Sequence, residues 1–240
     1  MDNLARKNSD GKETLLFDLS QTTVRDMNQY LHHNLDKSNV SNIRIIHPDG
    51  AHSIAVGLDV PVNIEIEGHA GYFCAGMNKQ ANVTINGNVG WSVAENIMSG
   101  MVRVKGYASE CAGASGHGGT LIIERDASLR CGISMKGVDI IVGGSVGNFS
   151  AFMAQDGHLV VCGDAGDGLG DSIYEAIIYV RGKIKSLGAD ARIEPLTDED
   201  HKVLAKLLAL AGFKHDTKEF KRVASARQLY HWNADANQEY

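Results

Sequence analysis

Residues 82–100 read NVTINGNVGWSVAENIMSG, and residues 101–119 read MVRVKGYASECAGASGHGG. In both stretches the second and fourth residues are Val or Ile, and a glycine stands two residues after the fourth. The same arrangement recurs every 19 residues through seven units, whose marker positions are Gly68, Gly87, Gly106, Arg125, Gly144, Gly163 and Gly182. A fixed period of this length indicates the stacked coils of a solenoid.

Each unit predicts a short strand that ends in a tight corner. Alternate residues of a strand point to opposite faces, so the two apolar residues before each marker share one face. Glycine at the marker is expected to turn the backbone sharply, because glycine adopts positive φ without steric cost. A single unit cannot bury its apolar face, whereas units stacked about 4.8 Å apart share one continuous core.

The repeat predicts the fold class: an all-β solenoid, namely a single-stranded, right-handed parallel β-helix of about seven 19-residue rungs over residues 61–187. Right-handedness follows from the usual hand of parallel crossovers. Small residues seven positions after each marker predict a tight corner near the axis. Arg125 and Lys185 break the glycine pattern, and Arg125 is expected to face solvent. The predicted structural corners are Gly68, Gly71, Gly87, Gly90, Gly106, Gly144, Gly147, Gly163, Gly166 and Gly182.

The N-terminal 60 residues do not follow the repeat. Residues 1–12 are polar and are expected to form a flexible tail. Residues 13–60 are expected to form an α/β cap on the first rung, with a strand that starts at Thr14 and a helix that starts at Thr23. A turn signal at residues 47–50, His-Pro-Asp-Gly, lies between two apolar stretches and predicts a hairpin.

The C-terminal region, residues 188–240, predicts a helix and a docking tail. Thr197 precedes three acidic residues, and Gly212 follows an apolar run, which is typical of a capped helix. The basic and aromatic stretch after Gly212 has two interpretations. It is either a second helix packed on the flank of the solenoid or an arm that docks on an acidic partner surface. The candidate docking residues are Phe220, Arg222, Arg227, Tyr230 and Trp232.

Composition excludes several classes of protein. The net charge of −6 argues against a general nucleic-acid binder. No apolar run approaches the roughly 20 residues that span a bilayer, and the polar N-terminus lacks a signal-peptide pattern, so we expect a cytoplasmic protein without membrane partners. The four cysteines form no C-x-x-C pair and are expected to be reduced, buried side chains.

The sequence offers no convergent reactive set. Calcium binding through Asp164, Asp167 and Asp171 is conceivable, but the spacing fits neither the EF-hand loop nor the calcium-binding nonapeptide repeat. We predict instead that these aspartates bond to their own backbone at turns. Ser115 and His117 lack the orienting third group of a nucleophilic site. We therefore predict no catalytic, cofactor-binding or metal-binding residue on this chain.

The corners at residues 87–90 (GNVG) and 144–147 (GSVG) resemble those of the GXGXG domain family. In that family the β-helix forms the C-terminal part of the glutamate synthase large subunit. The resemblance covers about residues 40–190. Here the domain is nearly the whole chain, as in the free-standing GXGXG subunit of N-methylglutamate synthase, and residues 225–232, SARQLYHW, favour that subunit.

The resemblance implies a non-catalytic scaffold subunit of a hetero-oligomer. Its partners would be a glutamine-amidotransferase-like subunit and an FMN-binding, glutamate-synthase-like subunit. The complex would convert methylamine and L-glutamate to N-methyl-L-glutamate and ammonium. FMN and any iron–sulfur cluster would belong to the synthase subunit, so no cofactor is expected on this chain.

Other functions stay open at this point. The same domain occurs as one subunit of formylmethanofuran dehydrogenase and as a GXGXG subunit of glutamate synthase. A stand-alone β-helix enzyme is a further alternative, although hexapeptide acyltransferases repeat by six residues and 19 is not a multiple of six. A module that carries ammonia through its interior would need a polar lumen, and the predicted lining is apolar.

Overall fold

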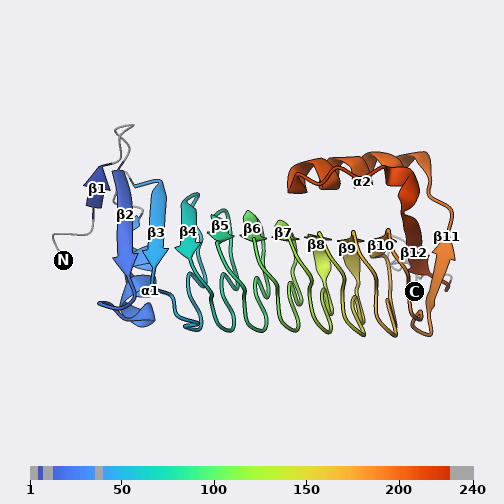
Figure 1. The fold of residues 1–240 in the computed structure, drawn as a ribbon, viewed down its shortest axis with the longest axis horizontal. Helices are drawn as coiled ribbons and strands as arrows, with labels where there is room; N and C mark the ends of the chain where they lie inside the picture. Colours follow the sequence, from blue (N-terminus) through green and yellow to red (C-terminus); the bar gives the residue numbers. More distant parts are fainter. Residues whose placement is uncertain (1–4, 8–12, 36–39, 228–240) are drawn as a thin grey trace, which may run out of the picture.

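The computed structural model describes residues 5–7, 13–35 and 40–227. The chain forms one twelve-stranded sheet, wound as stacked coils, in the order β1-β2-β3-β4-β5-β6-β7-β8-β9-β10-β12-β11 (Figure 1). Strands β2 to β10 pair in parallel, while β1, β12 and β11 are antiparallel additions at the two ends. The predicted parallel β-helix is therefore confirmed.

Every unit of the repeat contributes one short strand, and two α-helices pack against the coils. The strands are β1 (Ala5–Lys7), β2 (Glu13–Asp18), β3 (Asn42–Ile46), β4 (Asn63–Glu67), β5 (Asn82–Ile85), β6 (Met101–Val104), β7 (Thr120–Ile123), β8 (Lys136–Val142), β9 (Asp156–Val161), β10 (Ile177–Val180), β11 (Ala191–Glu194) and β12 (Lys221–Ser225). The helices are α1 (Val24–His33), α2 (Asp198–Ala211) and the short 3-10 helix η2 (Thr217–Glu219).

The inward side chains of successive strands form one continuous core. Ile64 of β4 lies opposite Val83 of β5, which lies opposite Val102 of β6 and then Leu121 of β7. All four side chains are buried. Burying a side chain of this size contributes about 1.5–3 kcal/mol. Because each rung covers the faces of its two neighbours, this stabilisation is distributed along the stack.

The marker glycines permit close packing between rungs, which corrects the role predicted for them. Among the marker residues only Gly68 has a positive φ. A Cβ on Gly87 would lie 2.4 Å from the carbonyl oxygen of Gly68, and a Cβ on Gly106 would lie 2.2 Å from Asn88 Oδ1. A methyl group would therefore overlap the preceding rung. Glycine is needed here because two coils approach closely, and not because of φ.

Left-handed backbone lies instead five, seven and nine residues after the marker. In the first unit these residues are Phe73, Ala75 and Met77, with φ of 58°, 53° and 54°. The N–H of Phe73 donates to the Trp91 carbonyl of the next rung, and that of Ala75 donates to the Ile54 carbonyl of the previous rung. These bonds hold non-glycine residues in a conformation that costs about 1–2 kcal/mol each.

The left-handed triplet recurs in every unit but the last. The middle residue of each triplet is small and buried, which confirms the predicted tight corner. Ala189, at the corresponding position of the last unit, is exposed and has no positive φ, because the coils end there. The recurring triplets are Ser92, Ala94 and Asn96; Cys111, Gly113 and Ser115; Arg130, Gly132 and Ser134; Phe149, Ala151 and Met153; and Gly168, Gly170 and Ser172.

The N-terminal cap continues the same sheet in parallel, so the predicted hairpin is wrong. β3 pairs in parallel with both β2 and β4, and Ile54 and Val56 lie in turns between β3 and β4. The connection runs around a full coil, and a tight turn at residues 47–50 therefore does not reverse the chain. Helix α1 begins after its N-cap Thr23, as predicted, and buries Met27 and Leu31. Ala5–Lys7, inside the predicted flexible tail, forms β1 beside β2.

A second core lies between the outer face of the sheet and α2 (Figure 1). The central outward residues of β4 to β6 are Glu65, Thr84 and Arg103, whereas the residues that continue this column on β7 to β10 are apolar or aromatic and buried. Strands buried on both faces read as continuous apolar runs. This change is present in the sequence, although the second core was not predicted from it. The second core contains Ile122, Ile141, Val160, Cys162, Tyr179, Leu204, Leu207, Leu208, Ala211 and Phe220.

Helix α2 has defined ends, as the sequence predicted. Thr197 and Asp200 form a reciprocal capping box at its start, and Gly212 adopts the left-handed conformation at its end. Arg103 of β6 donates to the carbonyl oxygen of Ala211 at 3.0 Å. A cation at a helix C-terminus interacts favourably with the helix dipole. Arg103 therefore marks the position where α2 stops on the sheet.

Gly87→Ala is expected to destabilise the protein by about 1–3 kcal/mol, the usual cost of overpacking, because its Cβ would press on the Gly68 carbonyl. Gly76→Ala is the matched control, since the nearest atom to its Cβ would be 3.4 Å away. Urea unfolding followed by circular dichroism measures both. Equal midpoints for the two variants would contradict the close-packing role of the marker glycines.

Arg130→Gly is expected to stabilise the protein by about 0.5–1 kcal/mol, because it relieves a left-handed residue. Arg130 is exposed and has φ of 56°. Arg125→Gly is the control, because Arg125 is equally exposed but lacks positive φ, so the added chain entropy should lower stability. Thermal unfolding measures the midpoint of both variants. A higher midpoint for Arg125→Gly than for Arg130→Gly would show that the left-handed triplet is unstrained.

Candidate interaction surface

Two histidine–aspartate pairs have the geometry that occurs in catalytic sites. His47 Nδ1 lies 2.8 Å from Asp18 Oδ1, and His158 Nδ1 lies 2.7 Å from Asp139 Oδ1. The hydrogen bond with His47 lowers the pKa of Asp18 to about 2, and the same bond raises the pKa of His47. Among the described residues, no hydroxyl or thiol bonds to either histidine. The pairs therefore lack the nucleophile of a catalytic triad.

The aspartates of residues 163–171 connect neighbouring rungs. Asp164 Oδ1 accepts from the backbone N–H of Lys183 at 2.7 Å, and Asp167 pairs with the ammonium group of Lys185 at 2.6 Å. The prediction that these side chains bond their own backbone is wrong for Asp164 and Asp167, because their carboxylates bond to residues of the next coil. The Asp171 carboxylate accepts from the hydroxyl of Ser172. In the part of the chain that the structure describes, no group of three or more His, Cys, Asp or Glu residues could hold a metal ion.

Burial keeps the thiols of three of the four cysteines protonated. All four are free, and Cys74, Cys131 and Cys162 are buried. Burial raises the pKa of each of these three thiols to about 12. A thiol with so high a pKa is protonated at neutral pH and is a poor nucleophile.

An exposed aromatic stack is the most distinctive surface feature of the coils. The rings of His52 and Tyr72 stack with centroids 4.4 Å apart and an interplanar angle of 11°. Tyr72 and Trp91 stack in turn at 5.0 Å and 12°. Tyr72 is 39% exposed and Trp91 is 49% exposed. We call His52, Tyr72 and Trp91 the aromatic row.

Glycines beside the aromatic row leave the space that the rings occupy. A Cβ on Gly71 would lie 2.0 Å from His52 Nδ1, and a Cβ on Gly90 would lie 2.7 Å from Tyr72 Cδ1. The N–H of Tyr72 donates to His52 Nδ1 at 3.0 Å, which fixes the imidazole. The second glycine of these two Gly-x-x-Gly corners therefore allows a ring of the previous rung to lie flat against the coil.

Polar side chains near the aromatic row are already bonded within the chain. His69 Nδ1 accepts from the N–H of Asn88 at 2.9 Å, and Asn88 Oδ1 accepts from the N–H of Tyr107 at 3.0 Å. Residues 68–73 and 87–92 contain no Asp, Glu, Lys or Arg. The segments that carry Tyr72 and Trp91 are thus free of formal charge, whereas the next rung places Glu110 one period after Trp91.

Further apolar side chains extend this surface along the coils. They occupy positions one, four or five residues after the marker, and all are exposed: Phe73, Tyr107, Leu129 and Phe149. This surface was not predicted from the sequence. The 19-residue spacing of Tyr72 and Trp91 was the available signal, because residues one period apart lie on adjacent rungs.

The structure places the predicted docking residues in different environments. The predicted second helix is absent from the described residues, where β12 forms instead, between β10 and β11. Phe220 is 3% exposed in the second core, so its side chain is not at the surface. Arg227 is exposed and pairs with Asp190 at 2.7 Å. Tyr230 and Trp232 lie outside the described residues, and the docking role stays a prediction.

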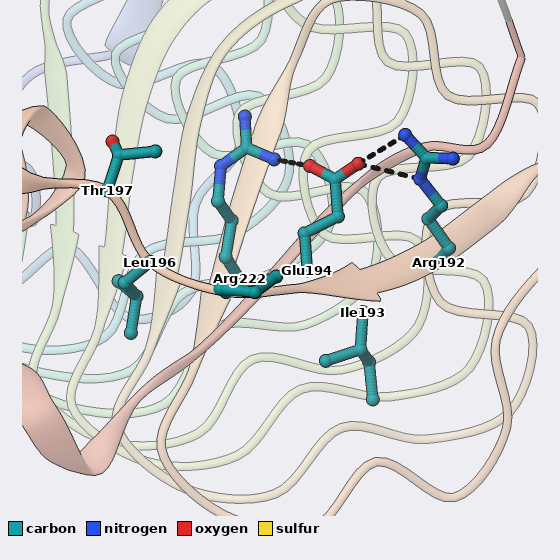
Figure 2. A pocket seen from close by; sticks show the side chains of 7 residues that line it. Arg192, Ile193, Glu194, Leu196, Thr197 and Arg222 are labelled. Carbon is teal, nitrogen blue, oxygen red and sulfur yellow. Dashed lines mark hydrogen bonds and ion pairs between the residues drawn. The ribbon is translucent and has the colours of Figure 1, made fainter.

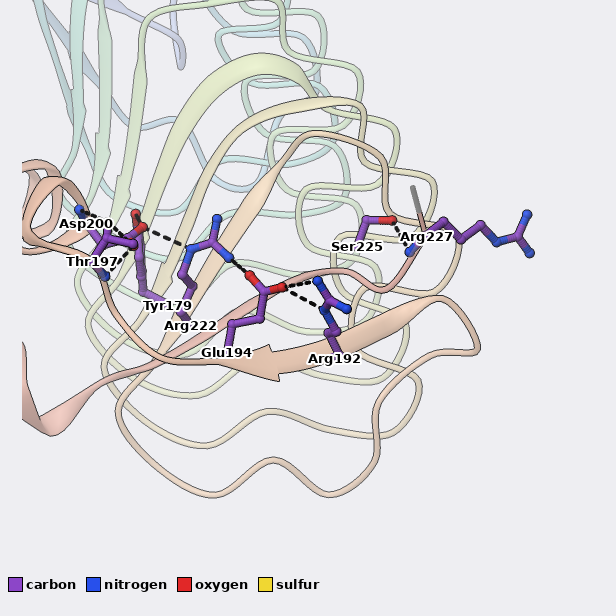
Figure 3. Close-up of polar contacts among 8 residues, drawn as sticks. All are labelled: Tyr179, Arg192, Glu194, Thr197, Asp200, Arg222, Ser225 and Arg227. Carbon is purple, nitrogen blue, oxygen red and sulfur yellow. Dashed lines mark hydrogen bonds and ion pairs between the residues drawn. The ribbon is translucent and has the colours of Figure 1, made fainter. Parts of the chain in front are cut away.

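Arg222 belongs to a buried polar network that ties β12 to α2 (Figure 3). Its Nε donates to Asp200 Oδ1 at 3.1 Å, and Tyr179 donates its hydroxyl to the same oxygen at 2.7 Å. Burial alone would raise the pKa of Asp200, but hydrogen bonds from Thr197 and Tyr179 and the charge of Arg222 outweigh it and lower the pKa. Burial and the bond to Asp200 raise the pKa of Tyr179. The network holds the helix start against the sheet.

Comparisons with known proteins give one informative relative. No family model and no solved structure matches the chain. The chain is 50% identical to Protein GlxC of Rhizobium meliloti (strain 1021) over 221 residues, which cover 92% of this chain and 97% of that protein. The chain belongs to the GlxC family. A match of this extent includes most of the coils.

In the described residues, neither helix combines the length and the apolar character needed to cross a bilayer.

Asp200→Asn is expected to cost about 2 kcal/mol at neutral pH, because the variant loses charge-assisted bonds from Arg222 and the capping box. Since the pKa of Asp200 is lowered by folding, its contribution is present above the ordinary carboxyl pKa. It is lost as pH falls through the depressed value. The difference between wild type and variant should therefore shrink in acid.

Asp198→Asn is the matched control, because Asp198 lies in the same helical turn but is exposed. Urea midpoints at neutral pH and in acid for the three proteins measure the effect. A wild-type advantage over Asp200→Asn that persists unchanged in acid would contradict an ionised Asp200 in this network.

Proposed function

We propose that this GlxC-family chain is a non-catalytic scaffold subunit of a multi-subunit, glutamate-synthase-like enzyme. The GXGXG-type corners support the relationship to glutamate synthase. The 50% identity to Protein GlxC, a relative of nearly the same extent, supports a role for the solenoid as a chain of its own. A solenoid presents a long rigid surface to other proteins.

The aromatic row is the observation that carries this proposal. Centres of protein interfaces are enriched in Tyr, Trp and Phe and depleted of charge. Tyr72 and Trp91 supply the aromatic rings, the segments 68–73 and 87–92 that carry them contain no charged residue, and stacking fixes the rings before a partner arrives. Ordered side chains lose less entropy on binding, which favours affinity. A glycan would need free polar groups to orient its hydroxyls, whereas the side chains of His69 and Asn88 are engaged within the coils.

The reaction we propose for the complex is that of N-methylglutamate synthase. Methylamine and L-glutamate would give N-methyl-L-glutamate and ammonium. A glutamine-amidotransferase-like subunit and an FMN-binding synthase subunit would carry the chemistry, and this chain would hold them together. The match covers 97% of Protein GlxC, and this supports the assignment over a glutamate synthase large subunit, in which the domain is fused to others.

Replacing both Tyr72 and Trp91 with Ala is expected to reduce recovery of partner subunits at least about tenfold, because aromatic anchors dominate interface energy. The tagged full chain would be co-expressed with the amidotransferase-like and FMN-binding subunits of the same organism. Recovery is quantified by mass spectrometry, and circular dichroism checks folding. Leu210→Ala, an exposed apolar residue on α2, is the control and should recover partners fully. Undiminished recovery with the double variant would refute the aromatic row as the docking surface.

The isolated chain is expected to form no N-methylglutamate from methylamine and L-glutamate, whereas the reconstituted complex should do so. Product is measured by chromatography with mass detection. Turnover by this chain alone would overturn the scaffold assignment. Partners that contain a molybdenum or tungsten centre would point to the formylmethanofuran dehydrogenase alternative.

A further inference from the structure

Among the described residues, the C-terminal end of the sheet is a strand with one unpaired edge. β11 is the outermost strand in Figure 1, and among the described residues it pairs with β12 alone. Within that described part, its other edge presents backbone N–H and C=O groups without strand partners. The natural complement of such an edge is another extended strand, because only a strand satisfies a row of alternating donors and acceptors.

The last layer of the main core is also open at this end. Ile193 of β11 lies opposite Val223 of β12, which lies opposite Ile178 of β10. Val223 and Ile178 are fully buried, whereas Ile193 is 53% exposed. In Figure 2 Ile193 points away from the side of β11 that carries Arg192 and Glu194. Ile193 therefore continues the inward column of the coils, and no further rung of the described part of the chain covers it.

The sequence of β11 is complementary to itself. In an antiparallel pair centred on Ile193, this residue would face its own copy, and Arg192 of each chain would face Glu194 of the other. Opposite charges directly across an antiparallel pair are stabilising. We propose that two copies of this chain associate through β11 around a two-fold axis, which joins their sheets end to end. Such an interface uses the same surface on both subunits.

The local ion pairs fit this arrangement. Arg222 contacts Glu194 from the neighbouring strand and holds its carboxylate on the outer face of the sheet. Arg192 also pairs with Glu194, at 2.6 Å, but its side chain is more than half exposed. The guanidinium of Arg192 can therefore reach a second carboxylate across the axis, while Arg222 keeps Glu194 in position.

A competing interpretation is that Arg192, Glu194 and the following Pro195 protect the edge. Charged residues and proline commonly prevent unwanted pairing of edge strands. Protection explains the charges but not the exposed Ile193, because an apolar residue at the open end of a core favours contact. The two interpretations predict different masses in solution.

Sedimentation velocity of the full chain alone, at micromolar to tens-of-micromolar concentrations, is expected to show a dimer. Arg192→Glu would place two Glu side chains opposite each other at two symmetry-related points and should weaken dimerisation about tenfold or more. Arg192→Lys keeps the charge and should dimerise like wild type. A monomeric wild type, or equal dimerisation by all three proteins, overturns the proposal.

Ile193→Cys tests the register. Residues directly opposite in an antiparallel pair have Cα atoms about 4.5–5.5 Å apart, which suits a disulfide. Mild oxidation should therefore give a covalent dimer with Ile193→Cys. Arg192→Cys, whose thiols would lie on opposite sides of the axis, should cross-link far less. Equal cross-linking of the two variants would refute the pairing. Both tests use this chain alone, so their failure leaves the scaffold proposal standing.

Discussion

The close approach of consecutive coils is the constraint on which the rest of the structure depends. At the marker corner the backbone of one rung lies so near the next that a Cβ on Gly163 would stand 2.6 Å from the carbonyl carbon of Gly144. This approach brings the N–H of Gly163 within 2.7 Å of the Gly144 carbonyl. Hydrogen bonding between rungs and the dry core behind it both require that spacing. The 19-residue period of the sequence is therefore a consequence of the spacing between coils.

The same spacing determines which residues can appear outside the coils. A side chain 19 residues before another lies directly beneath it, so short polar groups such as Asp126 and Ser145 can accept from the backbone of the next rung. Large rings at such positions stack, as Tyr72 and Trp91 do. The exterior is consequently organised in columns. The outward columns of β7 to β10 pack against α2, while the column that contains Tyr72 and Trp91 remains exposed.

The repeat predicted the architecture because core residues obey a strict period. Ile64 and its equivalents needed only alternation and spacing to be assigned correctly. The hairpin at residues 47–50 was mispredicted because a turn signal does not distinguish a reversal from the corner of a coil. The role of the marker glycines was mispredicted for a related reason. A glycine in the sequence is compatible either with positive φ or with the close approach of two coils. The positions of Phe220 and Arg222 were not predicted because their contacts, the second core and Asp200, are distant in sequence.

The two ends of the solenoid are treated differently, and this difference bears on function. At the N-terminal end α1 covers the first coils with Met27 and Leu31, so the core closes within the chain. At the C-terminal end α2 turns back over the outer face of β7 to β10, held by Asp200 and Arg222, and leaves β11 uncovered among the described residues. A helix used to cover the sheet cannot also cap the core. The fold thus leaves two apolar regions exposed among the described residues, one along the coils and one at their end. Their separation would allow the proposed scaffold to bind a copy of itself and other subunits at once.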